Sequence, residues 1–425
     1  MGYRLCSFSP VFCLLSLLLL LPALAPAAEF RLISDSILRG FESNTREGDD
    51  FALPVYEYLQ AEVGETGPLT FHFYGWGRLD LADSEYFAAY YGDSTAGELL
   101  YAYAEYRQPD TSLMARLGRQ YIFSGVTSES IDGLRLDTDL TPLFTLSAYT
   151  GRPVSLDIVD ERDEEILVGG RIAHHRRDLY EIGLSYRNLE TGGGRESVGI
   201  DTAFFLPGGV DFSGFSAYDL GGDGWGEHYY EARFDLGPLR LRPFFERYRY
   251  EDYFNAGDNT GGPFIFLAEI GETLTVFGAD ALWNRDDWEL GVKGKYYDYD
   301  ERGDSSFFLS GLATRQLEGL SQVGGELGRM EGDGSQDDYL LARAFVYWDQ
   351  IPPQRIFHFL TGDLVYVLYD EDIYDEDDSL FLSVGGGRRF MDDRLELRIA
   401  ADYSYDPYFD DDLRGWLLAQ YTFDR

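Results

Sequence analysis

The sequence predicts an all-β fold, a transmembrane antiparallel β-barrel of about 22 strands within a range of about 18 to 22. Three observations support this prediction. Apolar and polar residues alternate strictly along most of the chain. The connections alternate between short turns and longer acidic loops. The composition includes 32 Tyr, 30 Phe and 48 Gly, and aromatic residues without a helical period are typical of strands.

The N-terminal residues have the features of a secretory signal peptide. Arg4 supplies a positive charge, residues 11–21 are apolar, and residues 25–27 form an Ala-Pro-Ala cleavage motif. The apolar run is too short for a membrane helix. We therefore expect residues 1–27 to be removed and residues 28–425 to form a single transmembrane barrel, without a second domain.

The charge and the cysteines exclude several classes of function. The chain carries 35 Lys and Arg against 75 Asp and Glu, a formal net charge of −40, which disfavours nucleic acid and anionic lipid as partners. Both cysteines, Cys6 and Cys13, leave with the signal peptide. The mature chain is thus predicted to have no disulfide, no thiol nucleophile and no haem attached through C-x-x-C-H. We predict no cofactor.

The alternation is clearest in residues 394–407. One face of this segment is predicted to contact lipid and the other a wet lumen. Similar segments are about 10–12 residues long, as a tilted membrane-spanning strand requires. The lipid-facing residues are Leu395, Leu397, Ile399, Ala401, Tyr403 and Tyr405, and the lumen-facing ones are Glu396, Arg398, Asp402 and Ser404.

The connections fall into two sets. Short turns are predicted at 108–110, 175–177, 207–209, 237–238, 285–287 and 391–393. Longer acidic loops are predicted at 83–98, 157–165, 250–262, 300–304, 370–379 and 406–412. Tight turns on one rim and longer loops on the other are typical of outer-membrane barrels, with the turns periplasmic and the loops extracellular. The ring must close, because a strand edge in lipid would leave backbone groups unpaired.

A soluble β-sandwich or propeller is the alternative fold, but no blade signature repeats at a fixed period. The strand number depends on two segments. Residues 31–41 are interpreted as the first strand, and residues 263–283 could form one strand or two.

Charged residues at polar positions of the strands are candidates for lining the pore. Opposed Arg and acidic ladders set the ion preference of a pore, but the same residues could pair across strands and only hold the wall. An Arg facing lipid at mid-depth would cost about 2–4 kcal/mol, which favours the lumen. The predicted pore-lining residues are Arg78, Asp80, Glu181, Arg187, Arg240, Arg242, Arg343, Glu396, Arg398 and Asp402, and Arg247 and Arg249 are placed with them.

No enzymatic or metal site is predicted. The chain has five histidines, none of which has a nucleophile and an acid at a spacing that supports catalysis. The acidic runs lack the Gly and Glu positions of a calcium-binding EF-hand loop. We interpret these runs as solvated loops.

Two segments resemble known families. The last strand places Leu417, Ala419, Tyr421 and Phe423 on one face. It is similar to the C-terminal signature of bacterial outer-membrane barrels, which the insertion machinery reads, although Asp424 and Arg425 follow the final aromatic residue. Residues 113–137 are similar to a G-R-Q…D-G segment of porin-like families. The resemblance implies the Gram-negative outer membrane, with its lipid, lipopolysaccharide and insertion machinery as partners.

The layout also resembles the porin component of porin–cytochrome conduits of metal-reducing bacteria. That resemblance implies a pore-forming barrel that is a sheath for a periplasmic or extracellular multihaem cytochrome. The chain is expected to encode no plug, and its loops are too short to fold in and seal a wide lumen, which favours the sheath. The alternatives are a general diffusion porin for small polar solutes and a barrel without transport function, such as an adhesin or scaffold.

Overall fold

The computed structural model describes residues 29–424 except 46–47, 65–66, 85–93, 155–164, 177–178, 191–194, 223, 250–271, 334–337, 353 and 408–410. The predicted signal peptide lies outside the described residues, as do nearly all of the predicted loops 157–165 and 250–262. Cleavage of the signal and the single-domain boundaries therefore stay predictions.

The described chain folds into strands joined by turns. No described helix is long and apolar enough to cross a membrane. The strands are β1 (Phe30–Thr45), β2 (Gly48–Ala52), β3 (Pro54–Val63), β4 (Leu69–Asp80), β5 (Thr95–Arg107), β6 (Met114–Ser124), β7 (Thr127–Thr141), β8 (Phe144–Pro153), β9 (Ile166–Arg176), β10 (Tyr180–Glu190), β11 (Arg195–Leu206), β12 (Val210–Asp219), β13 (Gly224–Leu236), β14 (Leu239–Arg249), β15 (Thr273–Arg285), β16 (Trp288–Tyr299), β17 (Asp304–Gln316), β18 (Gln322–Gly332), β19 (Tyr339–Trp348), β20 (Phe359–Ile373), β21 (Glu376–Phe390), β22 (Leu395–Tyr405) and β23 (Asp411–Asp424).

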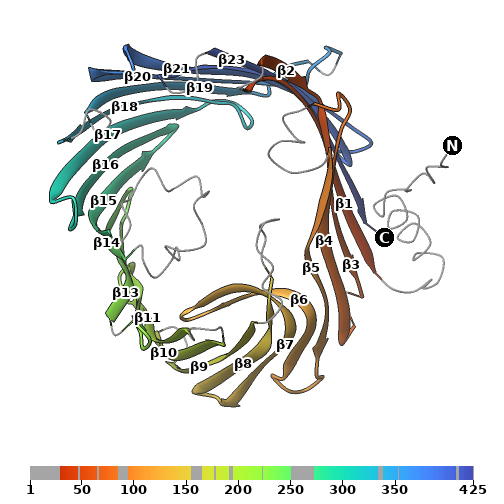
Figure 1. Cartoon of the computed structure of the whole chain (residues 1–425), viewed down its shortest axis with the longest axis vertical. Helices are drawn as coiled ribbons and strands as arrows, with labels where there is room; N and C mark the ends of the chain where they lie inside the picture. The colour runs from red at the N-terminus through yellow and green to blue at the C-terminus, as the bar shows by residue number, and fades with distance from the viewer. Residues whose placement is uncertain are drawn as a thin grey trace.

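The strands form one closed antiparallel ring (Figure 1). Neighbours in sequence pair with one another, and β1 pairs with β23 over Arg31 to Phe41, which closes the sheet. β2 and β3 both pair with β1 and are separated only by Leu53, so they share one position in the ring. The ring thus has 22 positions, and the predicted fold class is confirmed.

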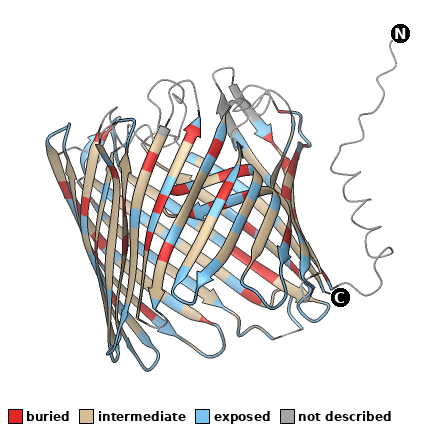
Figure 2. Ribbon diagram, turned by 90° about the horizontal axis from the view of Figure 1, so that it is seen from below, coloured by how far each residue is buried: buried red, intermediate tan, exposed pale blue. Residues whose placement is uncertain are grey.

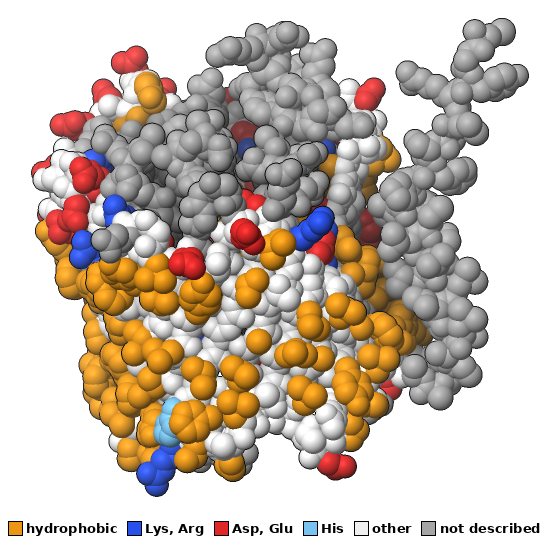
Figure 3. Space-filling model, turned by 60° about the horizontal axis from the view of Figure 1, so that its bottom comes forward, with side chains coloured by type: hydrophobic (Ala, Val, Ile, Leu, Met, Phe, Trp, Pro, Cys, Tyr) orange, Lys and Arg blue, Asp and Glu red, His pale blue; other side chains and the backbone are white. Residues whose placement is uncertain are grey.

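The two faces of the sheet differ in the way the alternation predicts. On β22, Leu397 and Ile399 are exposed on the outside while Glu396 is buried on the inside. The register carries this division around the ring, and apolar side chains cover much of the outer wall (Figure 3). An apolar exterior on a closed barrel is the surface that a lipid bilayer covers.

The two rims of the barrel carry different connections (Figure 2). We call the rim at which β3 meets β4 and β21 meets β22 the short-turn rim, and the opposite one the long-loop rim. The strand ends Arg31 and Asp424 pair at the short-turn rim. That rim also holds a longer connection, residues 349–358, which the short-turn pattern did not predict.

One predicted loop is wrong. Residues 370–379 were expected to form a longer acidic loop, but β20 continues to Ile373 and β21 begins at Glu376. Tyr374 and Asp375 make a two-residue turn with φ of 54° and 73°, as in the turns that suit the twist of a hairpin. Charged residues remain in strands here because this hairpin ends beyond the apolar part of the wall.

The other two segments that decide the strand number are settled in part. The predicted first strand, 31–41, lies within β1, which is longer at both ends. In the segment 263–283, only residues 272–283 are described, and they belong to β15 from Thr273 onward.

The tight turn at Tyr374–Asp375 gives a test of backbone strain. Asp375→Gly should raise the free energy of unfolding by about 0.5–1 kcal/mol, because glycine adopts a positive φ without a steric penalty. Urea unfolding in detergent micelles measures the change. The control is Asp377→Gly in β21, which should lower stability by about 0.5–1 kcal/mol, and a loss in both variants would contradict the assigned turn.

Candidate functional site: the inner face of the barrel

The ten predicted pore-lining residues all lie on the inner face by strand register. Each has the side-chain parity of Glu396, which faces the lumen opposite Arg389 of β21. Whether they govern the passage of ions stays a prediction. The ten are Arg78, Asp80, Glu181, Arg187, Arg240, Arg242, Arg343, Glu396, Arg398 and Asp402.

The placement of Arg247 and Arg249 in the lumen is wrong. On β14, Arg242 faces inward. Arg247 and Arg249 follow it at odd spacings along the same strand and therefore face outward. Arg247 lies opposite His228 near the long-loop rim, and its guanidinium is 3.5 Å from Asp300. An arginine near the bilayer interface costs far less than one at mid-depth, so the outer face tolerates it.

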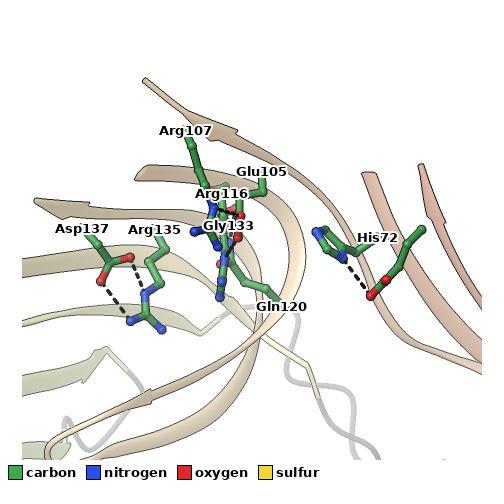
Figure 4. A network of polar contacts seen from close by, with 9 residues as sticks. His72, Glu105, Arg107, Arg116, Gln120, Gly133, Arg135 and Asp137 are labelled. Carbon is green, nitrogen blue, oxygen red and sulfur yellow. Dashed lines mark hydrogen bonds and ion pairs between the residues drawn. The ribbon is translucent and has the colours of Figure 1, made fainter. Parts of the chain in front are cut away.

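Arginines on the inner face share carboxylates near the short-turn rim. Arg107 and Arg116 each donate from Nε to Glu105 over 2.6 Å, and the Glu105 side chain is only 5% exposed (Figure 4). The carboxylate is thus held by two charge-assisted hydrogen bonds. The cluster carries one surplus positive charge, and Arg107 is largely exposed to the lumen.

A second cluster repeats this geometry on the other side of the closing strands. Glu396 accepts hydrogen bonds from Arg398 and, over 2.7 Å, from Arg389. In both clusters an arginine lies two residues after the glutamate and a second arginine lies opposite it. A third acid, Asp235, accepts a hydrogen bond from Arg240 over 2.9 Å and lies 3.4 Å from Arg233, but Arg233 also pairs with Asp211, so this group has as many acids as arginines.

Other arginines of the inner face pair with one or two acids each. Arg343 donates to Asp363 over 2.9 Å from the adjacent strand, and Arg242 donates to Asp280 over 3.1 Å. Arg187 lies 3.8 Å from Glu129. The first two pairs join neighbouring strands and agree with the interpretation of ion pairs that hold the wall, whereas Arg187 and Glu129 come from β10 and β7, which are not adjacent. All three pairs reduce the field that these residues could exert on solutes.

The β6–β7 hairpin leaves the wall and lies inside the ring, over β8 to β10 (Figure 1). β5 pairs with β6 only from Met114 to Arg119. The rest of β6, from Gln120 to Ser124, pairs only with β7. At the tip, the amide of Val126 donates to Ser185 Oγ over 3.1 Å. The sequence predicted only that the loops are too short to fold in and seal the lumen, and it did not predict that two strands, β6 and β7, would leave the wall.

An apolar cluster fixes this hairpin to the inner wall. Ile122 and Ile131 from the hairpin pack with Tyr149, Leu167 and Leu189 from β8, β9 and β10. Both isoleucines have no exposed surface. The hairpin's opposite side carries the exposed rings of Tyr121 and Phe123, which face away from this cluster by strand alternation. The hairpin is thus a packed element that narrows the lumen.

Three glycines permit the bend at which the hairpin turns inward. Gly118, Gly133 and Gly151 lie side by side on β6, β7 and β8. Gly118 has a φ of +127°, and a Cβ on Gly133 would lie 2.1 Å from the carbonyl oxygen of Thr150. Only glycine allows backbones to approach this closely.

The porin-like G-R-Q…D-G segment coincides with this bend. Arg119 donates two hydrogen bonds of 2.8 Å to Asp132 and one of 3.0 Å to the carbonyl of Leu99. The Leu99 carbonyl belongs to the part of β5 that no longer pairs with β6. The amide of Gln120, nearly fully buried, donates to the Gly133 carbonyl over 3.2 Å (Figure 4). The motif therefore has a structural role that its sequence alone did not reveal.

The histidines lie in separate environments. His72 Nδ1 is 3.5 Å from Glu62, whereas His228 Nδ1 is 2.8 Å from the Ser216 hydroxyl. No described histidine contacts both a carboxylate and a nucleophile. Within the described ranges, no three His, Cys, Asp or Glu side chains are placed to hold a metal ion.

The C-terminal residues predicted to act as an assembly signal lie together on the outer face of β23, and the signal itself stays a prediction. They are Leu417, Ala419, Tyr421 and Phe423.

Comparison with known proteins gives the fold. No protein-family model matches the chain, and no curated protein matches it in sequence. The siderophore receptor PirA from Pseudomonas aeruginosa is similar in structure, with a TM-score of 0.55, 12% identity and coverage of 92% of this chain and 80% of that chain. The outer membrane protein OprD from the same organism has a TM-score of 0.42 at 10% identity, with 94% of each chain covered. At such identities the likeness to PirA shows the fold alone, and the lower score supports no conclusion.

The docking of the hairpin can be tested with a single cysteine, since the described chain has none. Val126→Cys should react slowly with a maleimide. Adding Ile131→Ala should accelerate labelling at least tenfold, because emptying a fully buried isoleucine site costs about 2–5 kcal/mol. Leu134→Ala, on the outer face of β7, is the control and should leave the rate unchanged. Equal rates in all three proteins would mean that the hairpin is not held at the wall.

Proposed function

We propose that the chain is an outer-membrane channel through which small polar solutes diffuse, and that the β6–β7 hairpin sets its narrowest part. The proposal rests on one observation, the closed ring whose inner face is lined by ion pairs and polar groups and narrowed by a packed hairpin. A barrel that only anchored or displayed loops would need neither feature.

The orientation follows from the rims. The short-turn rim is assigned to the periplasm and the long-loop rim to the cell exterior, as in outer-membrane barrels generally. Lipid and lipopolysaccharide then surround the apolar wall, and the barrel-insertion machinery is the assembly partner. The paired arginines would give a wall of low net charge, and the clusters around Glu105 and Glu396 would each bring two arginines to one carboxylate near the periplasmic mouth.

A sheath around a multihaem cytochrome is the second candidate. The width of a ring with 22 strand positions favours it, because such a lumen is large enough to admit a partner. The inward hairpin disfavours it, because it occupies space that a partner would need. If the chain is a cytochrome sheath, its native complex would conduct little current and would purify with haem.

Planar-bilayer recording of the purified protein tests the channel. We expect large, weakly gated conductance, and a further increase when residues 121–130 are replaced by a short glycine turn that removes the hairpin tip. Haem absorbance of protein extracted gently from its native membrane tests the sheath. The diffusion channel would be rejected if the wild-type protein conducted no current in the bilayer, or if haem co-purified with it in constant proportion.

The shared carboxylates give a prediction on selectivity. Glu105→Gln with Glu396→Gln should raise the chloride-to-potassium permeability ratio about twofold or more, because each cluster then exposes two uncompensated arginines. Reversal potentials in a salt gradient measure the ratio. Asp378→Asn, which changes a carboxylate on the outer face of β21 bonded to Tyr366, is the matched control. An equal effect of the control would show that these clusters do not face the permeating ions.

A further inference from the structure

We propose that the inner wall of β3, β4 and β5 is a binding track for neutral saccharides. The inference rests on the proposed function, because these side chains meet solutes only in an open lumen. The track consists of Tyr56, Tyr58, Tyr74, Trp76, Tyr101 and Tyr103, all half-buried and all on the inner face.

The rings form a continuous path along the wall. Trp76 lies 6.4 Å from both Tyr56 and Tyr58, and Tyr58 lies 6.5 Å from Tyr74. Tyr74 then lies 5.5 Å from Tyr101 between ring centroids. Such spacings are those of adjacent aromatic pairs, so the rings present one surface instead of isolated contacts.

The path continues toward the short-turn rim. Tyr101 lies 5.7 Å from Tyr103, which stacks on His72 at 4.7 Å. Along β4 the rings extend from His72 to Trp76, about 13 Å of strand. This extent is longer than a single sugar ring, so the surface suits a chain of such rings.

Two carboxylates beside the track have partners among the described residues. His72 Nδ1 lies 3.5 Å from Glu62, and Glu105 is held by Arg107 and Arg116. A cationic solute therefore finds these two carboxylates already engaged, and an anionic solute is better served by the exposed arginines near the short-turn rim, such as Arg107. The uncharged rings between these groups favour a neutral ligand.

Two buried polar atoms beside the rings have no hydrogen-bond partner among the described residues. They are Asp35 Oδ1, on the inner face opposite Tyr58, and His72 Nε2. Buried polar groups normally find partners, so both atoms call for a ligand that carries donors and acceptors. A saccharide has both, because its ring faces are apolar C–H surfaces and its edge is lined by hydroxyl groups. Tyrosine and tryptophan offer rigid surfaces that match it at low entropic cost.

The test is block of the ion current by a neutral linear hexasaccharide of glucose. In the wild type we expect block of the current that increases with the concentration of the hexasaccharide. The double variant Tyr74→Ala with Tyr101→Ala should raise the half-blocking concentration about tenfold, because two ring contacts are lost. The double variant Tyr74→Phe with Tyr101→Phe keeps the rings and should change the half-blocking concentration less than threefold. This comparison separates a loss of binding from a loss of folding. Tyr297→Ala, an inner-face tyrosine on β16, should leave the half-blocking concentration unchanged. A polyethylene glycol of equal size is the steric control, and equal block of all variants by both polymers would overturn the track.

A second measurement separates this inference from the channel proposal. In detergent, the hexasaccharide should change the tryptophan emission of the wild type but not of Trp76→Phe. A change in emission without any conductance would reject the channel and retain the binding site. Conductance without any change in emission, and without specific block, would retain the channel and reject the saccharide site.

Discussion

The structure depends on the requirement that every backbone polar group within lipid be paired inside the protein. β1 meets this requirement by pairing with β3 on one side and β23 on the other. Because side chains alternate with a period of two, this closure fixes which face is wet for the whole ring, and a slip of one residue would turn the wall inside out. This register determines which side chains face the lumen, including the paired arginines and the aromatic rings.

Much of the wall could be predicted from the sequence because lipid imposes a local pattern. In residues 394–407 the alternation alone identified the strand and both of its faces. The pattern fails where the bilayer ends, because charged residues are then tolerated in strands as well as in loops. Residues 370–379 therefore looked like a loop and form a hairpin. On β14, aromatic residues occupy both faces, Phe244 inside and Phe245 outside, so parity at Arg247 could not be assigned from hydrophobicity.

The interior was less predictable, because its contacts join distant parts of the chain. Val126 meets Ser185 across the inner wall, and no local pattern distinguishes a hairpin that folds inward from one that stays in the ring. The glycines of the bend were visible, but not the fact that they align on adjacent strands. The sequence Tyr101-Ala-Tyr103-Ala suggests tyrosines toward lipid. Only the buried Glu105, which shares their parity, shows that the tyrosines face inward and the alanines outward.

Since the first strand bonds to the last, the barrel cannot seal until its final residues have been synthesised. The energetic burden of joining such remote segments is small, because loop-closure entropy adds only about 0.6 kcal/mol for each doubling of length. The difficulty is one of timing. Until β23 arrives, β1 presents an open edge to every other nascent chain nearby. A chain that still lacks β23 therefore keeps one edge of β1 unpaired, and this edge favours self-association until the ring closes.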